Sequence, residues 1–151
     1  MTRPGVKPAI FGIAVIALGV LIVDAGSKAA AMVLASRNVG GGVILPVQNA
    51  DFTLGVASAA FPLMLLLSTL GILAFGGYTA QAAARGSLAA WIPGLLIGGA
   101  IGNLGDRLLF GAVHDWLDLG RAVVNVADLA VLVGVVGYFA SFAIAWTRHS
   151  Q

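Results

Sequence analysis

Residues 98–107 read GGAIGNLGDR, and this stretch decides the class of the fold. Glycine recurs at every fourth residue from Gly94 to Gly102, which is the small-residue ridge that lets membrane helices pack closely. Asn103 and Arg107 follow on one helix face, because they are four residues apart. We expect the glycines to pack against other helices and the two polar residues to line a polar cavity. The alternative for Arg107 is snorkelling to the membrane interface.

The composition of the whole chain supports a membrane protein. Its 151 residues are 60% hydrophobic and only 9% charged, with a mean hydropathy of +1.01. A soluble domain is about 25% charged, so neither a water-soluble globule nor a disordered chain fits. The absence of cysteine excludes disulfides, thiolate metal sites and cysteine nucleophiles. The net charge of +2 is too small and too dispersed to indicate a nucleic-acid partner.

Long uncharged stretches predict an all-α membrane protein with four transmembrane helices in a single domain, residues 1–151. A span needs about 20 mostly apolar residues. The first helix is expected to continue through Asp24 and Lys28, and the last to start near Val123. Residues 36–56 are rich in glycine and β-branched residues, which favours a small β-like or loop segment on the outer membrane surface. The expected spans are 9–34, 57–77, 88–105 and 123–146.

Four spans place both termini on one side of the membrane. Lysine and arginine are equally numerous on the two sides, so their count alone does not set the orientation. The segments on the side of the termini are shorter, however, and therefore denser in positive charge. We expect the termini in the cytoplasm and every acidic residue towards the outer face.

All six acidic residues are aspartates, and several have a possible partner nearby in sequence. Asp24 and Lys28 share a helix face, so they form either a structural ion pair or a contact to substrate or a lipid headgroup. His114 precedes Asp115, but the only other histidine is His149 at the opposite membrane face. A multi-histidine metal site is therefore excluded, and no motif supports a serine-histidine-aspartate triad.

Two aspartates stand near the outer ends of adjacent expected spans. Asn125 and Asp128 share one face of the last helix, where they could act as a helix cap; Asp128 lies too deep for a cap if that helix starts at Val123. If Asp115 and Asp128 met, they would share a proton, and their pKa values would belong to the pair. The ionised acid could then take a proton from water while the protonated one binds a carbonyl oxygen. Sequence alone does not bring them together.

Four motifs resemble those of the bacterial lipoprotein signal peptidase (signal peptidase II) family, and they occur in family order. They are DAGSK at 24–28, GGAIGNLGDR at 98–107, VHDW at 113–116 and NVAD at 125–128. The resemblance implies a four-span aspartic endopeptidase of the bacterial inner membrane. Such an enzyme removes the signal peptide from diacylglyceryl-modified prolipoproteins, cutting before the lipidated cysteine. It implies that the enzyme uses no metal or organic cofactor and works as a monomer surrounded by membrane phospholipid. It also implies inhibition by globomycin-type cyclic peptides.

The resemblance also assigns roles to residues of this chain. It makes Asp115 and Asp128 the catalytic pair. The residues it implies for substrate binding or support are Asp24, Lys28, Asn49, Gly102, Asn103, Arg107 and Asn125.

The chain departs from the family pattern in three places. Residues 49–55 read NADFTLG, Val124 stands where an aromatic residue is usual, and the spacer between Asp115 and Asp128 is short. These departures keep one alternative open, a divergent non-catalytic paralogue that acts as a lipoprotein- or lipid-binding accessory protein. A small ion or proton carrier is less well supported, because the second and third expected spans have no charge in their apolar bodies.

Overall fold

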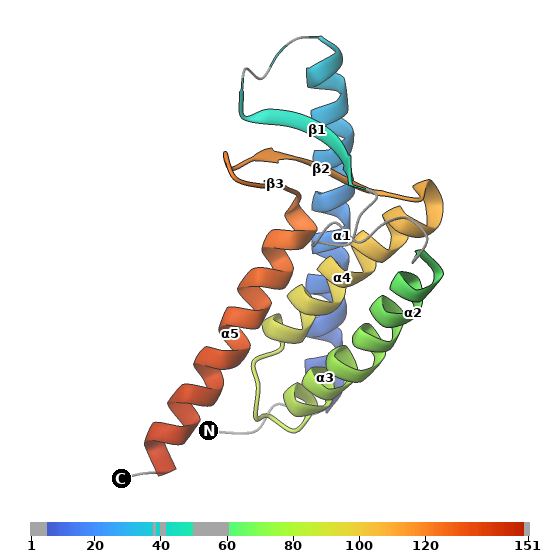
Figure 1. The fold of residues 1–151 in the computed structure, drawn as a ribbon. Coiled ribbons are helices and arrows are strands. Elements are labelled where there is room, and N and C mark those ends of the chain that lie inside the picture. The colour runs from blue at the N-terminus through green and yellow to red at the C-terminus, as the bar shows by residue number, and fades with distance from the viewer. Residues whose placement is uncertain (1–5, 38, 40–41, 50–60, 150–151) are drawn as a thin grey trace.

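The computed structural model describes residues 6–37, 39, 42–49 and 61–149, which form a mostly helical fold with a small antiparallel sheet at one end (Figure 1). The elements in chain order are α1 (Val6–Ser36), β1 (Ile44–Asn49), α2 (Phe61–Gly71), the π-helical turn η2 (Ile72–Gly76), α3 (Gly77–Ala84), α4 (Trp91–Phe110), β2 (Val113–Asp118), β3 (Val123–Val124) and α5 (Val126–His149).

Three helical segments of the described residues are long and apolar enough to cross a membrane: Val6–Ser36, Pro62–Ala84 and Val126–Thr147. Most of their side chains face outwards, as expected for helices surrounded by lipid. The fourth long helix, α4, carries Asp106 and Arg107 near its end and does not meet the same criteria. Three spans are therefore supported, and a fourth span through α4 stays a prediction.

Two helices run further than the uncharged stretches indicate. The helix expected at 57–77 continues to Ala84, while residues 57–60 lie outside the described part of the chain. Helix α4 continues past the expected end at residue 105 to Phe110. Gly111 ends it with a left-handed φ of 74° and donates its N–H to the Arg107 carbonyl at 3.0 Å. Helix α1 runs without interruption through Asp24 and Lys28, as expected.

The start of the last helix was predicted wrongly. Val123 and Val124 form strand β3, which suits β-branched residues, and α5 begins only at Val126. Asn125 Oδ1 accepts the N–H of Asp128 at 2.8 Å, and Asp128 Oδ2 accepts the N–H of Asn125 at 3.2 Å. This reciprocal pair is a capping box. The capping interpretation is therefore correct, and Asp128 lies in the first turn of α5.

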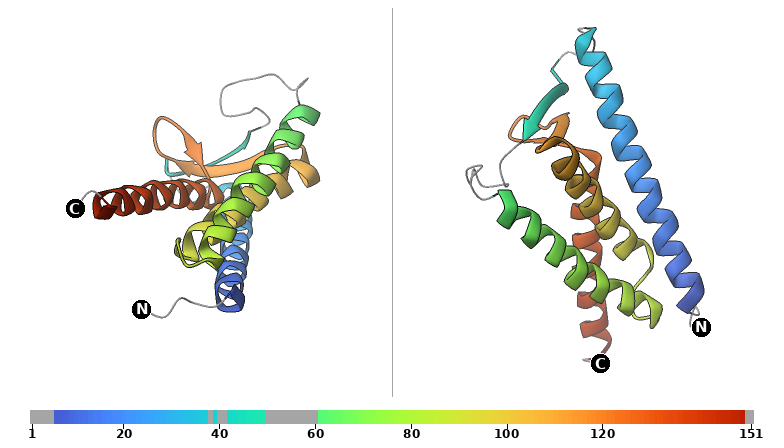
Figure 2. Two further views of the ribbon diagram at one scale, coloured as in Figure 1. Left: turned by 90° about the horizontal axis from the view of Figure 1, so that it is seen from below. Right: turned by 90° about the vertical axis from the view of Figure 1, so that its right-hand side faces the viewer.

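The glycines of α4 let it pack between α1 and α5, as predicted (Figure 2). A Cβ at Gly98 would lie 2.8 Å from the Ala17 carbonyl oxygen of α1. A Cβ at Gly99 would overlap the carbonyl oxygen of Ala127 at the start of α5. This close approach brings the polar end of α4 against the first turn of α5.

The sheet lies at the end of the molecule opposite the first turn of α1 and the last turn of α5 (Figure 1). Its strand order is β1-β2-β3, with both pairs antiparallel. Val47 pairs with Asp115, and Leu117 pairs with Val124. Strand β2 therefore carries Asp115 past the segment that opens α5. This arrangement places Asp115 near Asn125, to which it is hydrogen-bonded.

Candidate active site

Asp115 lies at the centre of a hydrogen-bond network that joins the sheet to α5. The residue is buried, with 4% of its surface exposed. Its Oδ2 accepts a hydrogen bond from Asn49 Nδ2 at 3.1 Å, and its Oδ1 accepts one from Asn125 Nδ2 at 2.6 Å. Strands β1 and β2 and the cap of α5 thus fix this carboxylate.

Asp128 is held by the same network from the helical side. Its Oδ1 accepts a hydrogen bond from Asn103 Nδ2 at 2.7 Å. Asn125 Nδ2 donates to Asn103 Oδ1 at 3.1 Å as well as to Asp115. The amides of Asn103 and Asn125 therefore connect the carboxylates of Asp115 and Asp128, which we call the aspartate pair.

The surroundings of Asp115 raise its pKa above the ordinary aspartate value. Burial is the largest cause, since it penalises the charged carboxylate, and the charge of Asp128 adds to it. The hydrogen bonds from Asn49 and Asn125 and the charge of Lys28 act in the opposite direction. The net upward shift favours the protonated form of Asp115 more than in an ordinary aspartate.

A cavity of about 380 Å³ opens beside Asp128 between α2, η2, α4 and α5. Asn103, Arg107 and Asp128 form its polar end. Arg107 Nη1 donates to the Asn103 carbonyl at 3.2 Å, whereas its buried Nε–H has no hydrogen-bond partner among the described residues. The remaining wall is largely apolar and includes Ile72, Phe75, Leu96, Ile97, Ala100, Val131 and Val135. The cavity can take an apolar segment and direct its polar end to Asp128.

A largely buried group of charges lies on the α1 side of the site. Asp24 and Lys28 form the predicted pair at 2.6 Å, and Lys28 Nζ also contacts Asp106 Oδ2 at 2.9 Å. Asp24 and Lys28 are 3% and 6% exposed. Gly102 packs here, since a Cβ would lie 3.2 Å from Asp24 Oδ2. Sequence reasoning missed Asp106, although its place at the end of the glycine ridge was a usable signal.

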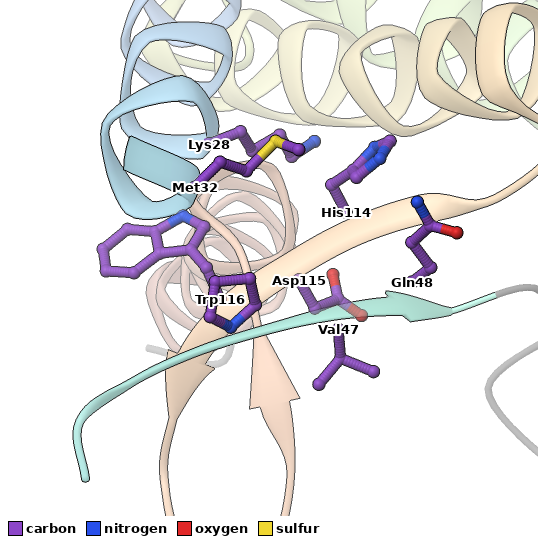
Figure 3. Close-up of a pocket in the computed structure, with 8 residues that line it drawn as sticks. Lys28, Met32, Val47, Gln48, His114, Asp115 and Trp116 are labelled. Carbon is purple, nitrogen blue, oxygen red and sulfur yellow. The ribbon is translucent and has the colours of Figure 1, made fainter. Parts of the chain in front are cut away.

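A second cavity, of about 210 Å³, lies between the sheet and α1 (Figure 3). His114 and Gln48 leave the strands on the side where Lys28 and Met32 of α1 lie, whereas Val47 points to the opposite side (Figure 3). The described residues contain no group of three or more histidine, cysteine or acidic side chains that could hold a metal ion. Of the divergent stretch 49–55, only Asn49 belongs to the described residues, and it contacts Asp115.

Comparisons with known proteins identify the family of the chain. Residues 16–144 match the family model described as signal peptidase (SPase) II. The chain is 31% identical to the lipoprotein signal peptidase of Methylobacterium sp. strain 4-46, over 87% of each chain. It is 32% identical to that of Pelotomaculum thermopropionicum, over 84% of each chain. The lipoprotein signal peptidase of Syntrophomonas wolfei is 38% identical, over 76% of this chain and 81% of its own.

Solved structures support the fold independently. Two structures described as bacterial membrane enzymes superpose with TM-scores of 0.70 and 0.69, each at 22% identity. The first alignment covers 100% of this chain and 94% of the other, and the second covers 94% and 97%. At this identity the likeness concerns the fold, whereas the family model and the relatives bear on the activity. The chain therefore belongs to the signal peptidase II family, whose members are membrane peptidases that process lipoproteins.

Proposed function

We propose that this protein is an intramembrane aspartic endopeptidase that removes the signal peptide from diacylglyceryl-modified prolipoproteins, cutting before the lipidated cysteine. Membership of the signal peptidase II family supports the reaction. The observation that carries the aspartic mechanism is the aspartate pair, which two bridged amides connect. Its member Asp128 lies at the polar end of the apolar cavity.

The two acids would divide the proton transfers between them. The raised pKa of Asp115 makes it the acid that holds the proton and donates a hydrogen bond to the scissile carbonyl oxygen. Asp128, as the ionised member, would take a proton from the attacking water. The water oxygen then bonds to the carbonyl carbon, and the proton held by Asp128 passes to the leaving amide nitrogen as the C–N bond breaks. This division matches the chemistry of two carboxylates that share one proton.

The apolar cavity gives the signal peptide a place to bind. Signal peptides contain an apolar stretch of about 7–15 residues, and the walls contributed by η2, α4 and α5 are largely apolar. The guanidinium of Arg107, at the polar end of this cavity, would donate to a backbone carbonyl of the substrate near the cleavage site. Asn49 and Asn125 would support Asp115, and Asn103 would support Asp128.

The proposed function also implies an arrangement in the membrane. We infer that α4 is the fourth span, that both termini lie in the cytoplasm, and that the aspartate pair faces the outer side of the inner membrane. The enzyme would work as a monomer among phospholipids, without metal or organic cofactor, and a globomycin-type cyclic peptide would inhibit it.

The test is a gel-shift assay in detergent micelles with a diacylglyceryl-modified prolipoprotein. Wild-type protein should release the shorter product, and Asp115→Asn and Asp128→Asn should release none while remaining folded. Asp118→Asn is the matched control, because Asp118 lies on the same strand as Asp115. Among the described residues, its side chain accepts a hydrogen bond only from the N–H of Gly120, at 2.6 Å. Cleavage by either pair variant at the wild-type rate would remove that residue from the mechanism. Binding without cleavage by folded wild-type protein would instead support the non-catalytic paralogue.

A further inference from the structure

A row of charges, of which Asp24 and Lys28 are buried and Asp106 is partly buried, spans the site on its α1 side. The proposed mechanism does not use it. Lys28 Nζ lies 2.6 Å from Asp24 Oδ2 and 2.9 Å from Asp106 Oδ2, so one cation joins two carboxylates. We call Asp24, Lys28 and Asp106 the charge strut. Its residues come from α1 and α4, and none of them belongs to the aspartate pair.

Each end of the strut binds the backbone next to one catalytic candidate. Asp24 Oδ1 accepts the N–H of Ala127 at 2.9 Å, and Ala127 immediately precedes Asp128. At the other end, Asp106 Oδ2 accepts the N–H of His114 at 2.9 Å. His114 immediately precedes Asp115 on β2, so the two ends hold the two halves of the site.

We propose that the charge strut fixes the separation between the two backbone segments that carry the aspartate pair, which makes Asp24, Lys28 and Asp106 positioning residues for the reaction. This inference rests on the proposed function. It assigns the Asp24 end to the placement of Asp128 and the Asp106 end to the placement of Asp115.

The geometry leaves the strut little freedom. Asp24 and Lys28 stand one turn apart on the continuous helix α1, so their spacing is set by the helix. Gly102 of α4 faces Asp24 so closely that a Cβ there would lie 3.2 Å from its Oδ2. Hydrogen bonds that involve charged groups are short and strong, so a strut of this kind resists displacement more than neutral contacts do.

Buried charges need a reason beyond stability. Replacing a buried ion pair with apolar side chains of similar volume is often neutral or stabilising. An apolar set could fill this space, but it could not accept the N–H groups of Ala127 and His114. The need to place those two N–H groups explains why a carboxylate stands at each end of the strut. Lys28, which contacts both carboxylates, sets the distance between them.

The experiment compares paired variants at each end by steady-state cleavage of a lipidated prolipoprotein. Asp24→Asn and Asp106→Asn keep an oxygen that can accept the backbone N–H, whereas Asp24→Leu and Asp106→Leu do not. We expect the leucine variants to lose about 10²-fold in kcat, the scale of a small misplacement of reacting groups. KM should stay within about twofold, because substrate binding is not changed. The asparagine variants should recover part of kcat, and Asp118→Asn should match the wild type.

A purely structural ion pair gives a different pattern. It would lower the folded fraction of each variant but leave kcat per folded enzyme unchanged, and this result would overturn the proposal. Equal losses in the asparagine and leucine variants, or losses confined to KM, would also overturn it. Lys28→Met would leave the carboxylates of Asp24 and Asp106 without their cation and so disturb both ends at once. The test therefore uses the end variants.

A second measurement does not depend on cleavage. NMR of protein labelled with carbon-13 at the aspartate carboxyls follows the titration of the pair in the free protein. The Asp→Asn variants identify the resonances. Asp24→Leu and Asp106→Leu should each change the titration of the pair, whose pKa values belong to both acids together. If folded wild-type protein cleaves nothing, the proposed function fails while this titration still tests the strut. Unchanged titration in both leucine variants would overturn the strut itself.

Discussion

Asn125 Nδ2 donates a hydrogen bond to Asp115 Oδ1 at 2.6 Å, so the residue that caps α5 also holds a carboxylate of the sheet. The oxygen of the same amide accepts the N–H of Asp128 at 2.8 Å. Asn125 is fully buried, and rotating its amide would break both contacts. One side chain thus couples the start of a membrane-spanning helix to the geometry of the proposed active site.

Substitutions at Asn125 should separate its capping role from its bridging role. Serine keeps an oxygen for the Asp128 N–H but has no amide to reach Asp115, so Asn125→Ser should lose about 10²-fold in kcat through misplacement of the pair. Asn125→Ala loses the cap as well and should be less stable than the serine variant by about 1 kcal/mol. Cleavage assays and chemical unfolding in micelles measure the two effects. Wild-type cleavage by Asn125→Ser would contradict the bridge.

The raised pKa of Asp115 predicts how stability should change with pH. Between the ordinary aspartate value, about 3.9, and the raised pKa of Asp115, the unfolded chain has already released this proton while the folded chain keeps it. The contribution of Asp115 to stability is therefore present at low pH and is lost as the pH rises through that window. Asp115→Asn should gain stability relative to wild type over the same range. Unfolding of both proteins across pH, with Asp118→Asn as control, checks the sign; an opposite trend would contradict it.

The sequence predicted most of the fold because strong local signals coincide with it. The long uncharged stretches identified the helices, and the glycine ridge of α4 does pack against its neighbours. The Asp24–Lys28 pair followed from helical spacing alone. The start of α5 was predicted too early because the apolar residues Val123 and Val124 are compatible with either a helix or a strand. They form a strand because they pair with β2.

The site was less predictable, because it depends on contacts between distant elements. The hydrogen bond from Asn49 to Asp115 joins residues 66 positions apart, and no local pattern specifies it. Asp106 was missed because its partners, Lys28 and His114, lie on α1 and β2. The motifs indicated which residues matter, whereas the packing of α4 between α1 and α5 determines how they meet.

Two glycines of α4 give a matched test of close helix packing. A Cβ at Gly99 would overlap the carbonyl oxygen of Ala127, whereas a Cβ at Gly105 would meet nothing within 4 Å. Gly99→Ala should therefore force α4 and α5 apart and cost about 1–3 kcal/mol of stability. Gly105→Ala should be neutral or stabilising by up to about 1 kcal/mol, because alanine favours the helix. Equal unfolding midpoints for the two variants in micelles would contradict the packing.

The apolar cavity can be tested by filling it. Ala100 lines the cavity, and Ala100→Phe would place an aromatic ring where the apolar part of the signal peptide is proposed to bind. Leu132→Phe is the matched control, because Leu132 is 58% exposed on the outer surface of α5. We expect Ala100→Phe to raise KM for a lipidated prolipoprotein at least about tenfold, the scale on which apolar pockets reject misfitting groups. Its kcat should change less, because Asp115 and its hydrogen bonds with Asn49 and Asn125 do not line this cavity. An unchanged KM in folded Ala100→Phe would place the signal peptide elsewhere, and a loss of kcat alone would assign this cavity to the chemical step rather than to binding.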